Sequence, residues 1–156
     1  MSSWRVRTAV ADDAEELVRL RVLMFEAMGR DVSATDWRQQ AVAVFKRELG
    51  GPDLIATVID APDGGLASCA AAFVRLDLPR PGQLGTVSAH LHNVCTDPAW
   101  RRRGLARLAV TALVEHLDAL GVPRSDLHAS EEGRGLYESL GFQVRDGGVE
   151  MVRRVS

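Results

Sequence analysis

The segment Asp97–Val110 reads DPAWRRRGLARLAV and places three consecutive arginines where a helix is expected to begin. A helix N-terminus carries about half a positive charge, so its first turn normally holds Asp or Glu rather than Arg. The same end presents unpaired backbone N–H groups, which bind anions and above all phosphates. Arginine adds charge-assisted contacts to phosphate oxygens, and Gly104 lets an anion approach the backbone closely. The segment therefore predicts a helix start built for a ligand with several negative charges.

A second interpretation of Arg101–Arg103 is a run of solvated surface charges, because charge runs usually lie on the surface. The order of the elements favours the anion site. A predicted strand precedes Asp97, and ligands of open α/β sheets bind where strand carboxyl ends face helix N-termini.

The composition indicates one globular domain over residues 1–156, with 46% hydrophobic and 26% charged residues. The net charge of −2 argues against a nucleic-acid or membrane partner. The two cysteines, Cys69 and Cys95, form neither a disulfide framework nor a metal-binding pattern. We therefore expect no metal. The chain shows no signal-peptide pattern and no apolar run of about 18 residues, so we expect a cytoplasmic protein.

Hydrophobic periodicity and turn residues divide the chain into strands and helices in the order β-α-α-β-β-β-α-β-α-β-β. Strands are expected over 4–9, 54–61, 66–76, 85–97, 125–129, 142–145 and 149–152. Helices are expected over 12–29, 36–49, 101–120 and 131–140. This order predicts an α/β (α+β) fold, in which one mixed sheet of about seven strands is flanked by about four helices.

Two motifs resemble those of the GCN5-related N-acetyltransferase (GNAT) superfamily. RRRGLA, residues 101–106, resembles the (Q/R)-x-x-G-x-(G/A) loop that binds the acetyl-CoA pyrophosphate, and residues 92–98 resemble the fourth strand that leads into it. LYESLGF, residues 136–142, resembles the family's LYxxLGF motif. The order of elements also matches over nearly the whole chain.

The resemblance implies a GNAT fold whose fourth and fifth strands separate at a bulge to admit the pantetheine arm of acetyl-CoA. Val87, Ala89 and Leu91 share one face of the expected fourth strand, and Val94 falls out of phase, which is compatible with a bulge near Asn93. The residues expected to bind acetyl-CoA are Val94, Cys95, Thr96, Arg101, Arg102, Arg103, Gly104, Leu105, Ala106 and Ser130. Ser130 is also interpreted as a helix N-cap.

The implied reaction transfers an acetyl group from acetyl-CoA directly to a primary amine, with no metal. Tyr137, in the LYxxLGF motif, is expected to give its proton to the leaving thiolate, although it also suits an aromatic packing position. A main-chain N–H at Val94 or Cys95 is expected to hold the oxyanion, while the Cys95 thiol is interpreted as a small buried hydrophobe. His90 and His92 share one strand face, and either is a candidate base; structural roles are the alternative.

The acceptor is expected to be a small molecule or a peptide with an amine. Asn93 is expected to orient it, and Glu26, on the first helical region, is expected to attract a cationic amine; solvated surface charge is the alternative for Glu26. A homodimer agrees with the resemblance, since relatives pair through sheet edges or C-terminal strands.

Two rival functions remain. A non-catalytic acyl-CoA-binding regulatory module of the same fold is favoured by the lack of Glu between Gly85 and Cys95, where many GNAT enzymes carry one. A nucleic-acid binder using Arg101–Arg107 is disfavoured by the net acidity and by the lack of interleaved aromatic residues.

Overall fold

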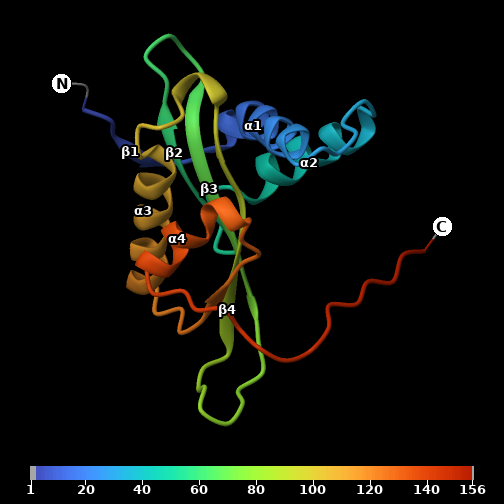
Figure 1. Ribbon diagram of the computed structural model, residues 1–156, viewed down its shortest axis with the longest axis vertical. Helices are drawn as coiled ribbons and strands as arrows, with labels where there is room; N and C mark the ends of the chain where they lie inside the picture. Colours follow the sequence, from blue (N-terminus) through green and yellow to red (C-terminus); the bar gives the residue numbers. More distant parts are fainter. Residues whose placement is uncertain (1–2, 156) are drawn as a thin grey trace.

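The computed structural model describes residues 3–155, which form one sheet with helices on both faces (Figure 1). The strands are β1 (Val6–Thr8), β2 (Leu54–Asp60), β3 (Leu66–Leu76), β4 (Val87–Thr96) and β5 (Ser125–Asp126). The helices are α1 (Ala14–Ala27), α2 (Asp36–Glu48), α3 (Leu105–Ala119) and α4 (Glu131–Ser139). Two 3-10 turns, η1 (Ala11–Asp13) and η2 (Pro98–Trp100), precede α1 and α3.

The sheet order is β1-β2-β3-β4-β5, with antiparallel neighbours except for the parallel pair β4–β5. Helices α1 and α2 pack on one face, and α3 packs on the other (Figure 1). Two parallel strands need a connection that returns the chain to the end of the sheet where the first strand began. Helix α3 makes this crossover connection from β4 to β5 along one face of the sheet. The predicted order of elements is confirmed as far as α4.

The periodicity of the buried residues explains how two apolar cores form. On β2, Leu54 and Val58 belong to the core under α1, while Ile55 and Ile59 belong to the core under α3. Leu113 and four other apolar residues of α3 follow helical spacing on one face and are at most 2% exposed. The sheet is therefore buried on both faces at its centre.

Strand β4 contains a bulge at Asn93. Cys69 pairs with Cys95 and Ala71 pairs with His92, so three steps along β4 match two steps along β3. Asn93 has a left-handed φ of 51° and is 3% exposed. The predicted bulge near Asn93 is confirmed.

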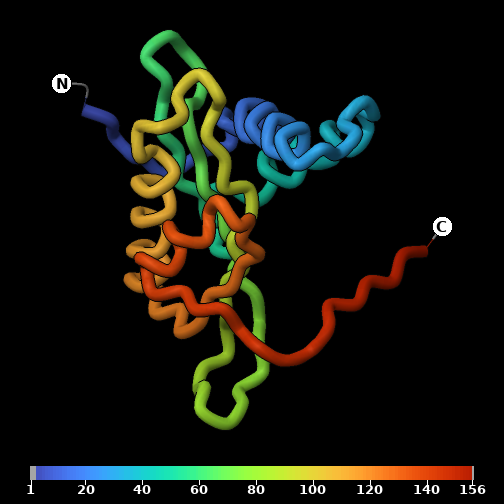
Figure 2. Tube along the Cα trace, viewed as in Figure 1, coloured from blue at the N-terminus to red at the C-terminus, as the bar shows by residue number. Residues whose placement is uncertain are grey.

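The expected sheet of about seven strands is wrong, because the sheet formed by residues 3–155 has five strands. Residues 141–155 contain no helix or strand, and the tail runs away from the sheet (Figure 2). Val149 and Met151, expected in the last strand, are 85% and 89% exposed. Their alternation with charged residues favours an extended chain, but a strand also needs a hydrogen-bonded neighbour, and the tail pairs with none of the described strands.

Two further boundaries differ from expectation. Strand β5 covers only Ser125–Asp126 of the expected 125–129, because the chain then turns away from β4 toward α4. Helix α3 begins at Leu105 rather than at residue 101, so Arg101–Arg103 lie in the loop before the helix. Within residues 3–155, no helix has the length and apolar character needed to cross a membrane.

Candidate functional site

An exposed cationic loop precedes α3. Arg102 and Gly104 have left-handed φ values of 65° and 74°, and they flank Arg103. Such turns let successive backbone N–H groups converge on an anion. None of Arg101–Arg103 forms an ion pair with a carboxylate among residues 3–155. The loop therefore offers uncompensated positive charge in front of a helix N-terminus.

The acidic residue at the start of this loop is held by other partners. Asp97 accepts hydrogen bonds from the Ala99 backbone N–H at 2.9 Å and from Arg19 Nη1 at 2.7 Å. Arg19 is itself paired with Glu16. The Ala99 N–H lowers the pKa of the Asp97 carboxyl, and Arg19 adds to this effect. Asp97 thus fixes the path of the chain and forms its ion pair with Arg19 rather than with Arg101–Arg103, although the nearby charge of Arg101 also lowers its pKa.

The end of β4 leads into this loop and carries Val94, Cys95 and Thr96. Cys95 donates from Sγ to the Leu20 carbonyl at 3.0 Å, and burial raises its pKa to about 11. Thr96 Oγ1 lies 2.9 Å from Ser68 Oγ. The Cys95 thiol is therefore protonated and held at neutral pH, as expected of a buried hydrophobe rather than a nucleophile.

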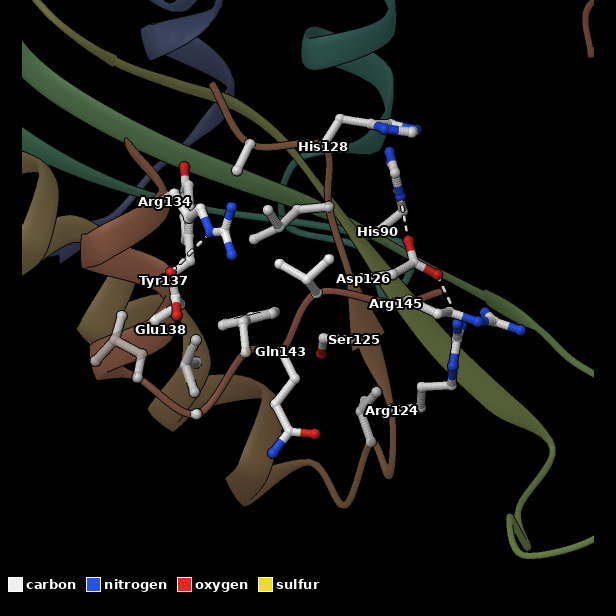
Figure 3. Close-up of a pocket in the computed structure, with 18 of the residues that line it drawn as sticks. His90, Arg124, Ser125, Asp126, His128, Arg134, Tyr137, Glu138, Gln143 and Arg145 are labelled. Atoms are coloured by element: carbon white, nitrogen blue, oxygen red, sulfur yellow. Dashed lines mark hydrogen bonds and ion pairs between the residues drawn. The ribbon is translucent and has the colours of Figure 1, made fainter. Parts of the chain in front are cut away.

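A cavity of about 1040 Å³ opens where β5, α3 and α4 meet β4 (Figure 3). Its lining brings together several of the predicted site residues. They are His90 from β4, Tyr137 from α4, and Ser130 at the start of α4.

Tyr137 occupies the α4 side of the cavity. Its ring packs edge to face against Phe142, with ring centres 5.9 Å apart. Burial raises the pKa of Tyr137, so its hydroxyl keeps its proton at neutral pH. Ser130 Oγ accepts from the Gly133 backbone N–H at 3.1 Å, which confirms its interpretation as the N-cap of α4.

The two β4 histidines lie in different surroundings. The ring centres of His90 and His92 are 4.3 Å apart. His90 Nδ1 is hydrogen-bonded to Asp126 Oδ1, which lies opposite it on β5. His92 has no hydrogen-bonded carboxylate among residues 3–155, and burial, with the nearby His90 and Arg21, lowers its pKa to about 4. The shared face is confirmed, but only His90 has an acidic partner.

The predicted acceptor residues lie outside this cavity. Asn93 Nδ2 donates to the Leu17 carbonyl, and Asn93 Oδ1 accepts from Arg21 Nη1, each at 3.2 Å. Both ends of the amide are thus bound to α1. Glu26 is exposed on the last turn of α1, and neither residue lines the cavity.

Asp126 is the site residue that the sequence analysis missed. It lies on a two-residue strand, and its contacts with β4 come from a parallel pairing that no local pattern indicates. Among residues 3–155, no group of three or more His, Cys, Asp or Glu side chains is placed to hold a metal ion.

The model of the acetyltransferase (GNAT) family matches residues 15–142. The chain belongs to this family.

A curated relative agrees with this assignment. Glucosamine 6-phosphate N-acetyltransferase 1 of rice (Oryza sativa subsp. japonica) is 35% identical over 95 residues, which cover 60% of this chain. The matched stretch spans only 55% of the rice protein.

Solved structures share the GNAT fold. A predicted acetyltransferase of Clostridium acetobutylicum, solved with acetyl-CoA, has a TM-score of 0.84 at 22% identity, with 96% of each chain covered. A GCN5-related N-acetyltransferase of Ralstonia eutropha has a TM-score of 0.82 at 22% identity, with 98% of this chain and 99% of that chain covered.

The depressed pKa of His92 makes stability depend on pH. Between about pH 6.5 and 4 the unfolded chain binds a proton at His92 that the folded chain does not, so this residue lowers the free energy of unfolding as the pH falls. We expect the His92 ring to titrate near pH 4 in an NMR titration. A midpoint near its ordinary value of 6.5 would contradict the burial that we assign to it.

Proposed function

We propose that this protein is an N-acetyltransferase that transfers an acetyl group from acetyl-CoA directly to a primary amine. The observation that carries the proposal is the arginine loop Arg101–Gly104, which has no ion-paired carboxylate among residues 3–155 and follows the bulged strand β4 after the short turn η2. The cavity beside β4 adds a proton donor, Tyr137, and a histidine, His90. Membership of the GNAT family and the acetyl-CoA bound to the Clostridium structure support the choice of co-substrate.

In this proposal the loop holds the pyrophosphate of acetyl-CoA. The guanidinium groups of Arg101–Arg103 and the backbone N–H groups at the start of α3 contact its oxygens, and Gly104 leaves room for them. Leu105 is 2% exposed and anchors the helix start in the core. The small side chain of Ala106 keeps the next turn open, and Val94–Thr96 border the pantetheine arm.

The chemistry requires a neutral amine, a site for the oxyanion and a proton for the leaving sulfur. A main-chain N–H at Val94 or Cys95, beside the bulge, stabilises the oxyanion. Tyr137 supplies the proton to the sulfur, because burial keeps its hydroxyl protonated. His90 accepts the amine proton; His92, with its pKa near 4, is a much weaker base than an ordinary imidazole.

The acceptor in this proposal is a primary amine of a small molecule or a peptide. The rice relative carries glucosamine 6-phosphate in its name, which makes amino sugars the first group of acceptors to test. Amino acids, other small amines and peptide N-termini complete the panel.

The alternative is a non-catalytic acyl-CoA-binding module. The observation that favours it is the absence of any carboxylate residue along β4, from Val87 to Thr96. Acetyl-CoA binding without CoA release across the whole panel would support this alternative over the enzyme.

The cofactor site can be tested by Gly104→Glu. The new side chain places bulk and negative charge where the pyrophosphate is bound, so calorimetric titration should show at least a tenfold loss of acetyl-CoA affinity, about 1.4 kcal/mol. Gly121→Glu is a matched control, since Gly121 follows the other end of α3, has a φ of 75° against 74°, and likewise has open space where a Cβ would lie. Equal losses in both variants would contradict the site.

The proton donor can be tested by Tyr137→Phe with an acceptor that the wild type acetylates. Removing a general acid lowers kcat by about 10²–10⁴-fold. The ring contact with Phe142 remains, so acetyl-CoA affinity should stay unchanged. CoA release followed with a thiol reagent measures kcat, and a variant with wild-type kcat would assign Tyr137 to packing alone.

A further inference from the structure

His90 and Asp126 form the last pair between β4 and β5. The parallel register pairs Ala89 with Ser125 and His90 with Asp126, and β5 ends at Asp126. Beyond His90, β4 continues beside β3 alone, through the bulge at Asn93. The pair therefore lies where the two strands separate, on the wall of the cavity.

Asp126 is fixed from several directions. Its Oδ1 accepts from His90 Nδ1, and its Oδ2 accepts from Arg124 Nη1 at 2.7 Å and lies 3.5 Å from Arg75 Nη2. Burial opposes ionisation, but the hydrogen bonds from His90 and Arg124 outweigh it and lower the pKa of Asp126. The carboxylate is thus charged and held in one orientation at neutral pH.

This arrangement decides which nitrogen of His90 carries the proton. A carboxylate can only accept, so Nδ1 must donate and the neutral ring has its lone pair on Nε2. Figure 3 shows the His90 ring between Asp126 and His128, whose ring centre lies 6.0 Å from that of His90. Nε2 therefore faces away from Asp126, on the side of His128.

We propose that Asp126 is a positioning residue that holds His90 with its proton on Nδ1, so that Nε2 is free to accept the proton of the acceptor amine. This inference rests on the acetyl transfer proposed above. In that reaction the N–C bond forms and the C–S bond of the thioester breaks. The amine proton passes to His90 Nε2, the Tyr137 proton passes to the sulfur of CoA, and proton exchange with water restores both side chains.

The test in solution is Asp126→Asn, compared with Asp118→Asn. Asp118 lines the same cavity but is exposed on α3 and has no ion pair among residues 3–155, so its variant removes the same charge without touching His90. We expect Asp126→Asn to lower kcat at least tenfold while the KM for acetyl-CoA stays unchanged. Asp118→Asn should keep both values. Unchanged kcat in Asp126→Asn would overturn the proposal.

The pH profile separates positioning from a purely structural role. The charged groups facing His90 are Asp126 on β5, Arg124 before it and Arg75 on β3; the other titratable groups beside it are the rings of His92 and His128. Removing the one negative charge in this set disfavours the imidazolium, so the acidic limb of the kcat profile should move to lower pH. In a His90→Gln background, Asp126→Asn should cause no further loss; an equal loss there would contradict action through His90.

A measurement on the wild-type protein decides the outcome if Asp126→Asn does not fold. Ring ¹⁵N NMR at neutral pH should show the His90 proton on Nδ1, and a proton on Nε2 would overturn the proposal. The tautomer does not depend on turnover. A wild-type protein that shows the Nδ1–H tautomer but acetylates no amine would therefore contradict the proposed function and not the His90–Asp126 geometry.

Discussion

The extra residue in β4 is the constraint on which the site depends. Asn93 adopts a left-handed backbone conformation, which costs on the order of 1 kcal/mol for a residue other than glycine. Its buried amide offsets this cost through hydrogen bonds with Leu17 and Arg21 of α1. Helix α1 thus holds the bulge, and the bulge redirects β4 just after its last pair with β5. The cavity lies beside this separation.

The arginines around α1 form ion pairs, whereas those before α3 do not pair with any described carboxylate. Arg7 pairs with Asp13 and Asp60, and Arg19 pairs with Glu16 and Asp97, so these arginines link α1 and its preceding turn to the sheet. The arginines of the loop before α3 have no described carboxylate partner. A chain with a net charge of −2 therefore concentrates positive charge at one helix start. Local pairing, rather than total charge, determines where an anion can bind.

The sequence predicts those parts of the fold and site that depend on neighbouring residues. The helix expected over 101–120, the cap at Ser130 and the phase change near Asn93 are local patterns, and the structure has each of them, with the helix beginning only at Leu105. The last two strands failed as predictions because alternation indicates an extended chain but does not supply a pairing partner. The His90–Asp126 contact joins positions 36 residues apart through a two-residue strand, so no local pattern indicates it. The role of Asn93 as an anchor for α1 likewise depends on packing across the sheet.

The central claim is that the arginine loop and the bulged end of β4 hold one continuous ligand. Titrating acetyl-CoA into the ¹⁵N-labelled protein and following the backbone amides tests it most directly. The account predicts that the amides of Arg101–Ala106 and of Val94–Thr96 shift together with one affinity, while those of β1 stay in place. Shifts confined to the loop, with the amides of β4 unchanged, would contradict it.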